Sequence, residues 1–218
     1  LYAEELVSTE GFSSNSSLIY HCYPPTLVKE ASEAVDVNPK AALNNNMKHR
    51  AFQGFQVNPE KDYLKSRKTV LFNNDLAINL ASPQSSLEDY FFKNASADEM
   101  IFIHEGKGKL ETIYGEIDFG YGDYLIIPRG TIYQIQFETQ KNRLLIVESY
   151  TPIHTPKKYR NKFGQLLEHS PFCERDIRKP KALKTIDQKG EFKVKIKKEG
   201  FLYDYTYATH PFDAVGWD

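Results

Sequence analysis

Short apolar runs separated by turn-forming residues fill the middle of the sequence, and they restrict the possible folds more than any other feature. These runs are Thr69–Phe72, Leu76–Ala81, Asp89–Phe92, Glu99–Glu105, Lys109–Ile113, Glu116–Phe119, Asp123–Ile127, Ile132–Phe137 and Leu144–Ser149. Gly, Pro and Asn occupy the intervals between most of them. Short strands at near-regular spacing are typical of a β-sandwich or a small β-barrel. The pattern therefore predicts an all-β fold for residues 69–150.

The composition agrees with a globular β-protein and argues against two classes of partner. Tyr and Phe each occur 14 times, and aromatic residues favour strands. The 28 Lys and Arg residues are balanced by 29 Asp and Glu residues, whereas a nucleic-acid-binding domain normally has a basic excess. The best apolar run, Leu144–Val147, is far shorter than the roughly 18 residues of a membrane-spanning helix. We therefore expect neither nucleic acid nor a membrane as a partner.

The first residues and the cysteines indicate a cytoplasmic location. Leu1–Glu5 shows neither the basic nor the apolar part of a secretory signal, and the absence of an initiator Met predicts a processed or truncated chain. Cys22 and Cys173 are the only cysteines, which fits a reducing compartment better than a disulfide-stabilised extracellular domain. We expect both to be reduced thiols.

Different patterns flank the central strands. Residues 1–68 contain one clear apolar stretch, Leu18–Tyr23, and residues 40–46 fit either a loop or a short helix. We therefore expect residues 1–68 to be a flanking segment packed on a barrel that is formed by residues 69–150. Residues 151–218 are expected to contain a long ordered loop, a β-hairpin and the start of a junction to another domain.

The hairpin is predicted from two alternating runs that follow the Pro-punctuated loop Ile153–Pro180. Apolar residues alternate with lysines from Phe192 to Lys197, and aromatic residues recur at every second position from Phe201 to Tyr207. This period of two is that of a strand, and Glu199–Gly200 supplies the turn. We expect the lysines to form a solvated face, and as edge-strand residues to discourage unwanted pairing.

Two glycine-bounded motifs narrow the fold further. In Gly122–Tyr133, a Gly is followed by five residues, a Pro, one residue and a Gly, which describes a strand between two turns. Upstream, Glu99–Gly108 has an acidic residue, an apolar strand and a turn bounded by glycines. In this order, the motifs resemble the two signatures of the cupins. The resemblance implies a double-stranded β-helix, or jelly roll, with additional flanking strands and few helices.

The metal ligands of the cupins are missing from these motifs. Metal-binding cupins have a His-x-His pair just before the acidic residue, but Phe92–Asp98 contains no histidine. A further histidine is replaced by Tyr133. Imidazole and carboxylate groups would hold iron or manganese at this place, and Glu99 by itself cannot. We expect a barrel without metal, in which the ring of Tyr133 fills the interior.

A wider set of segments carries a more specific resemblance. They are Lys48–Arg50, Leu71–Asp75, Asp98–Gly108, Ile126–Tyr133, Tyr159–Ile177 and His210–Trp217. Together they resemble the homogentisate 1,2-dioxygenase family in its bacterial form, over nearly the whole chain. The resemblance implies a protein of two cupin barrels in which the N-terminal barrel is structural. It also implies that the C-terminal barrel holds Fe(II) with two His and one Glu and supplies a catalytic His.

By this resemblance the chain ends before the iron ligands, at a junction near Pro211–Trp217. We therefore expect no catalytic, cofactor-binding or metal-binding residue in this chain, and no activity from the chain alone. The whole protein is expected to open the ring of homogentisate with O2, giving maleylacetoacetate in tyrosine and phenylalanine catabolism, and to form trimers or hexamers. The alternative is a non-catalytic cupin module for small-ligand binding or oligomerisation.

Other candidate groups have weaker patterns. Three pairings could suggest a metal site, namely His21 with Cys22, His104 with Glu105, and His169 with Cys173, but none has the spacing of a structural zinc site. The triplet Glu168–Ser170 does not predict a nucleophile, because adjacent residues of an extended chain point to opposite faces. The basic and aromatic stretch Lys157–Lys162 is followed by Glu168, Glu174 and Asp176, which favours a salt-bridged surface or a subunit contact.

Overall fold

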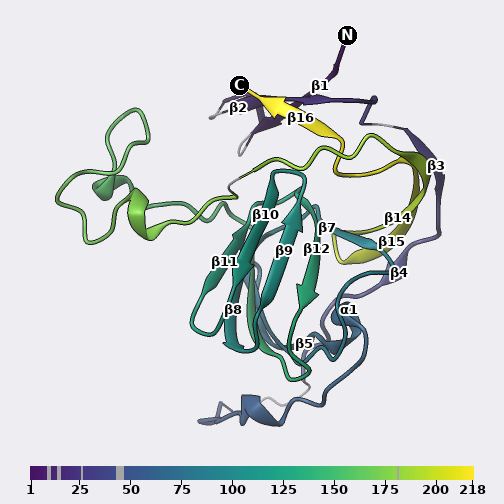
Figure 1. Ribbon diagram of the computed structural model, residues 1–218. Coiled ribbons are helices and arrows are strands. Elements are labelled where there is room, and N and C mark those ends of the chain that lie inside the picture. Colours follow the sequence, from purple (N-terminus) through teal and green to yellow (C-terminus); the bar gives the residue numbers. More distant parts are fainter. Residues whose placement is uncertain (9–10, 14–15, 26, 43–46, 181) are drawn as a thin grey trace.

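Two sheets form the body of the protein in a computed structural model, which describes residues 1–8, 11–13, 16–25, 27–42, 47–180 and 182–218 (Figure 1). The smaller sheet has the order β11 (Tyr124–Ile127), β8 (Asp98–Glu105), β13 (Arg143–Ser149), β6 (Leu76–Ala81) and β5 (Lys68–Phe72). The larger sheet has the order β10 (Gly115–Phe119), β9 (Gly108–Thr112), β12 (Ile132–Phe137), β7 (Phe91–Asn94), β14 (Lys189–Lys198), β15 (Phe201–Thr209) and β3 (Val28–Ala31), with β4 (Val35–Asp36) also paired to β15.

The main core lies between these two sheets. Along β8 and β13 every second residue is buried, because successive side chains of a strand point to opposite faces. Ile101 and Ile146 of the smaller sheet and Tyr133 and Ile135 of the larger one are each fully buried in the same cluster. The predicted jelly roll is therefore confirmed, and its interior is filled by side chains.

The central strands lie where the sequence predicts them. Leu76–Ala81 and Ile132–Phe137 coincide with β6 and β12, while the expected strand Asp89–Phe92 is displaced toward its C-terminal end as β7. The turn after β11 requires a glycine, as the sequence predicts, because Gly130 has a φ of 86°. The turn is closed by a hydrogen bond from the backbone amide of Thr131 to Pro128 O. Local pattern and turn chemistry thus account for this part of the barrel.

The C-terminal hairpin is confirmed, but its expected position at a sheet edge is wrong. β14 lies inside the larger sheet, antiparallel to β15 and parallel to β7. Lys193 is exposed, whereas the ammonium of Lys197 reaches Glu148 Oε2 at 2.5 Å. The lysines of β14 therefore do not form one solvated face, because the pairing with β7 brings the end of the strand against the buried acidic groups of the barrel.

A third sheet joins the two ends of the chain above the barrel (Figure 1). Its order is β1 (Ala3–Ser8), β2 (Ser16–His21) and β16 (Ala214–Trp217). Of these, only β2 corresponds to an apolar stretch of the sequence. Since β3 and β4 also pair with β15, the N-terminal segment contacts both the barrel and the C-terminal strands.

The remaining segments contain short helices. These are α1 (Tyr63–Ser66) and the 3₁₀ helices η1 (Gly11–Ser13), η2 (Gly54–Gln56), η3 (Lys157–Tyr159) and η4 (Glu174–Asp176). Residues 153–180 form the predicted long loop, interrupted only by η3 and η4. The possible helix at residues 40–46 lies largely outside the described residues. Among the helices that the structure describes, none has the length and hydropathy to cross a membrane.

Candidate functional site

The interior of the barrel holds a buried polar network centred on Glu99. Arg67, at the end of α1, donates from Nη1 to Glu99 Oε1 at 2.5 Å, and the Tyr133 hydroxyl donates to Glu99 Oε2 at 2.7 Å. The other terminal nitrogen of Arg67 donates to the hydroxyls of Tyr63 and Tyr133 at 2.6 and 2.8 Å. Both carboxylate oxygens of Glu99 are therefore engaged by side chains of this chain.

A second carboxylate completes this network. Glu148 Oε2 accepts from Lys197, and Asn94 Nδ2 lies 3.3 Å from Glu99 Oε1 and 3.2 Å from Glu148 Oε2. Two cations, Arg67 and Lys197, thus balance two carboxylates. Burial of Glu148 opposes its ionisation, but the charges of Lys197 and Arg67 outweigh burial and hold its pKa below the ordinary value.

These residues do not fit a metal ion. Glu99 holds the position of the acidic cupin signature, but the positive charge beside it is the guanidinium of Arg67. Tyr133 fills the space next to it, fully buried, with its ring 5.5 Å from that of Phe92. Within the described ranges, no group of three or more His, Cys, Asp and Glu side chains is arranged to hold a metal ion.

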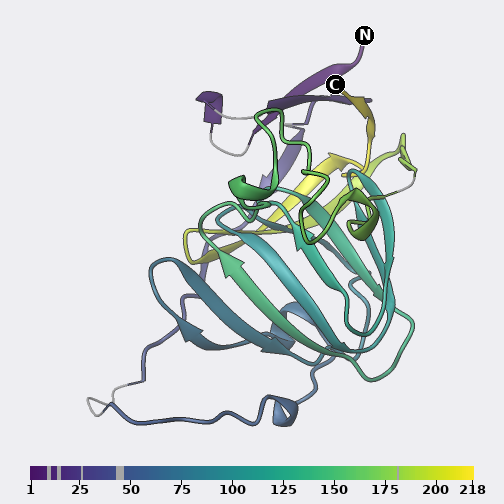
Figure 2. The ribbon, with the colours of Figure 1, turned by 90° about the vertical axis from the view of Figure 1, so that its left-hand side faces the viewer.

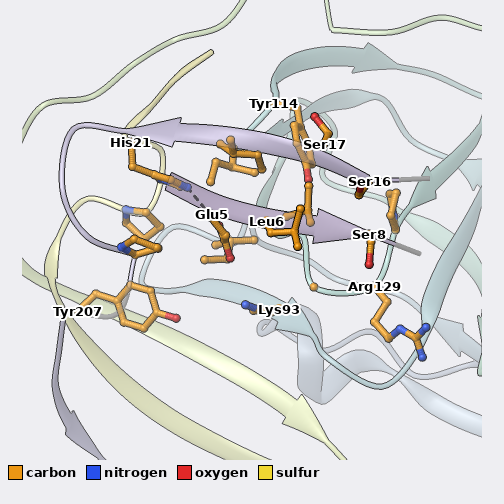
Figure 3. Close-up of a pocket in the computed structure, with 18 of the residues that line it drawn as sticks. Glu5, Leu6, Ser8, Ser16, Ser17, His21, Lys93, Tyr114, Arg129 and Tyr207 are labelled. Carbon is orange, nitrogen blue, oxygen red and sulfur yellow. Dashed lines mark hydrogen bonds and ion pairs between the residues drawn. The ribbon is translucent and has the colours of Figure 1, made fainter. Parts of the chain in front are cut away.

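A cleft of about 590 Å³ lies between the third sheet and the rim of the barrel (Figure 3). Glu5, Ser8 and Ser17 line it from β1 and β2, and Lys93 and Tyr207 line it from the larger sheet. The ammonium of Lys93 points into the cleft (Figure 3), and its charge contributes to a lowered pKa of Glu5, for which the hydrogen bond to His21 is the largest cause. The cleft therefore combines a cation and a nearby carboxylate with hydroxyl groups and aromatic rings.

His21 forms one wall of this cleft and joins three segments of the chain. Its Nδ1 lies 2.8 Å from Asp213 Oδ1 and its Nε2 lies 3.1 Å from Glu5 Oε2. Burial lowers the pKa of His21, but the hydrogen bonds to Asp213 and Glu5 and the charges of these groups outweigh burial and raise it to about 9. The imidazolium form is therefore stabilised between two carboxylates, and His21 is not paired with Cys22 as a metal ligand.

The structure does not bring the remaining candidate residues of the sequence together in one site. His104 is half-buried, and its ring packs against Phe55 with the centroids 4.3 Å apart. His169 is exposed, and the Ser170 hydroxyl donates to the carbonyl oxygens of Leu167 and Phe172. Cys22 and Cys173 are both free thiols. The triplet around His169 is therefore part of a turn and has no geometry for nucleophilic catalysis.

Of the two interpretations of the Lys157–Lys162 stretch, the salt-bridged surface is wrong for the part of the loop that the structure describes, and the subunit contact stays a prediction. Lys158 lies over the ring of Tyr159, and Lys162 lies over the ring of Phe163. Of the acidic residues behind the stretch, Asp176 pairs with its neighbour Arg175, while Glu174 accepts from the backbone amide of Leu166. Each of these two lysines therefore contacts the aromatic residue that follows it in the sequence, and not an acidic residue farther along the loop.

Sequence reasoning missed the partners of both carboxylate systems. Arg67 lies in the flanking segment with no motif around it, and Asp213 is separated from His21 by 192 positions. The sequence placed Glu99 and the buried ring of Tyr133, because both occupy positions of the cupin signatures, but it did not indicate the hydrogen bond between them. Pairs of residues so far apart in the sequence are brought together by the fold, and no local sequence pattern indicates them.

Fold and site together define a cupin-type jelly roll whose interior is packed with side chains and contains a buried Arg–Glu–Tyr network. Comparison with protein families gives a match over residues 1–218 to the family described as homogentisate 1,2-dioxygenase N-terminal. The chain belongs to this family. A protein of Saccharolobus solfataricus whose curated name gives it, provisionally, as a dioxygenase is 34% identical over 218 residues, which are 100% of this chain and 56% of that protein. The chain thus spans about half the length of this curated relative.

Solved cupin structures show more distant similarity. A cupin-2 domain protein of Shewanella frigidimarina is 19% identical, with a TM-score of 0.34 over 38% of this chain and 79% of that chain. A cupin superfamily protein of Desulfitobacterium hafniense is 17% identical, with a TM-score of 0.39 over 50% of this chain and 98% of that chain.

Proposed function

We propose that this chain is the structural barrel of a longer protein that opens the aromatic ring of homogentisate with O2, giving maleylacetoacetate. The observation that carries the proposal is the family match over residues 1–218, and the archaeal relative supports it. Fe(II) would be the only cofactor, held by a part of the longer protein outside these residues. The product would enter tyrosine and phenylalanine catabolism in the cytoplasm, and the longer protein would be a homo-oligomer, a trimer or hexamer.

The geometry of the barrel supports this division of labour. Arg67 and Tyr133 already satisfy the carboxylate of Glu99, so the barrel interior offers no open ligand position for a metal. The buried network instead connects α1, both barrel sheets and β14 through side chains. In this proposal residues 1–218 supply a folded support, and the remainder of the protein supplies the redox chemistry.

The test compares the longer protein with the 218-residue chain. The longer protein is expected to contain stoichiometric iron and to consume O2 in equimolar amount with homogentisate, measured by metal analysis and an oxygen electrode. The 218-residue chain is expected to bind no stoichiometric iron and to consume no O2. An iron-free, inactive longer protein would falsify the enzymatic proposal. Tight, stoichiometric iron on the short chain would contradict the division of labour.

A second candidate function is binding of a small anionic ligand in the cleft of Figure 3, favoured by the position of Lys93. Among the described contacts, the Lys93 ammonium makes neither a hydrogen bond nor a close ion pair, although its charge acts on Glu5 at longer range, so its N–H groups can donate to the carboxylate of a ligand. We expect the 218-residue chain to bind phenylacetate, with affinity measured by calorimetry, and Lys93→Met to weaken binding roughly tenfold or more. The matched control is Lys141→Met, which changes an exposed lysine outside the cleft. Absence of binding, or equal binding by both variants, would rule out this site.

A further inference from the structure

The smaller sheet of the barrel is apolar on its outer face as well as its inner face. On β8, β13 and β6 the residues that alternate with the buried ones are only partly covered, and on β11 they are exposed. Most of these outward residues are apolar, although a sheet with one face in water normally alternates apolar with polar residues. Tyr124 is 62% exposed, Ile126 44% and Leu71 52%. This face differs from an ordinary solvated sheet surface.

Strand register joins these residues into a continuous surface. One row is Tyr124, Phe102, Leu145 and Leu80, and the next is Ile126, Met100, Val147, Ile78 and Leu71, where each residue is directly opposite its neighbour on the adjoining strand. We call these nine residues the outer apolar face. The Phe102 and Tyr124 rings are in contact, with centroids 4.8 Å apart. The nine residues carry no charge, and on β5 the first row ends against the charged Lys68, which is directly opposite Leu80. An uncharged apolar area with a charged border has the composition of an interface and not of a surface facing water.

Two segments of the chain lie at the borders of this face. At one end, Gly54 and Phe55 of η2 lie against Leu80 and His104. At the other end, the long loop leaves β13 close to the start of β8, where the backbone amide of Ile153 donates to Asp98 Oδ2. In Figure 1 the long loop projects to the left of the barrel and the segment with η2 lies below it, and in Figure 2 the two segments lie above and below the strands. Between these borders the described part of the chain leaves Tyr124, Ile126 and Leu71 exposed and the other six residues of the face half-buried.

The size of the relative indicates what covers the face. The match covers 56% of the Saccharolobus solfataricus relative, which therefore has about 170 residues outside it, the size of a typical domain. A tethered domain meets the face at an effective concentration of the order of millimolar, which a second copy of the chain does not reach at ordinary protein concentrations. Tethering therefore favours the remainder of the same polypeptide over a second copy.

We propose that the outer apolar face is the docking surface for the remaining domain of the same polypeptide. The proposal rests on that part of the proposed function in which the chain belongs to a longer protein. It assigns a role to a surface that neither the buried network nor the cleft uses. The smaller sheet would thus pack its inner face on the barrel core and its outer face on a second domain.

Thiol labelling of the longer protein tests the proposal. Ile126→Cys places a thiol on the face, and Lys141→Cys places one at an exposed turn away from it; Cys22 and Cys173 are changed to Ser in both proteins. We expect a polar maleimide to label Ile126→Cys at least about tenfold more slowly than Lys141→Cys, because labelling requires local opening of the interface. In the 218-residue chain the two thiols should react at similar rates, and circular dichroism reports whether each variant is folded.

The outcomes separate the possible occupants. Equal labelling of the two variants in the longer protein would overturn the proposal, because the face would be open. Protection that is lost on dilution, or that is already present in the 218-residue chain, would identify a second copy as the occupant and would also overturn it. Iron content and O2 consumption of the parent protein are measured separately. The labelling result therefore tests the docking surface even if the longer protein proves to be inactive.

Discussion

Arg67→Met is expected to lower the free energy of unfolding by about 3–5 kcal/mol, the largest effect of any single change considered for this protein. The guanidinium is buried, with its side chain 8% exposed, and Met retains most of its apolar volume. Its loss leaves Glu99, which is 1% exposed, without its cation, and removes a donor from the hydroxyls of Tyr63 and Tyr133. For a chain of this length the melting temperature should fall by roughly 10 °C, measured by thermal and urea unfolding.

A double-variant cycle distinguishes loss of the ion pair from loss of packing. Glu99→Gln alone removes the charge that Arg67 neutralises, while Arg67→Met with Glu99→Gln leaves neither charge buried. The double variant should be more stable than the sum of the single effects predicts, by about 1–3 kcal/mol, because residues in one network couple. Lys68→Met is the matched control, since Lys68 is a half-exposed neighbour whose ion pair with Glu60 contributes little. Additive effects would contradict a specific pairing of Arg67 with Glu99.

The second large effect is a loss of stability at alkaline pH that depends on His21. The pKa of His21 is raised to about 9 in the folded chain, whereas histidine in an unfolded chain has a pKa of about 6.5. Between these values the folded state binds more protons, so the free energy of unfolding falls as pH rises. The stabilisation is complete below about pH 6.5 and is lost through pH 9, with a total of about 3 kcal/mol.

His21→Gln provides the comparison, because Gln keeps a hydrogen-bonding side chain but does not titrate. The difference in unfolding free energy between the parent and the variant should shrink as pH rises from 6.5 to 9, measured by urea unfolding at each pH. His104→Gln is the control, since His104 packs against Phe55 away from the third sheet. A difference curve that is flat across this range would show that His21 is not held as an imidazolium between Glu5 and Asp213.

The fold and the candidate site were accessible from the sequence to different degrees. Alternation and turn residues define the strands Leu76–Ala81 and Ile132–Phe137, because these features act over a few residues. The position of β14 was not accessible, since the same alternation suits an edge strand or an interior one. Its parallel pairing with β7 depends on where the long loop returns the chain.

The sequence alone determines the class of fold, the glycine-bounded turns and the absence of histidines before Glu99. Tertiary structure decides what surrounds Glu99: Arg67 is 32 positions away and Lys197 reaches the network from a strand near the C-terminus. It also decides that His21 meets Asp213 and that the outward residues of β8, β11 and β13 form one apolar surface. The physical reason is range, because strand period and turn geometry are local, whereas charge pairing and burial depend on segments that only the folded chain brings together.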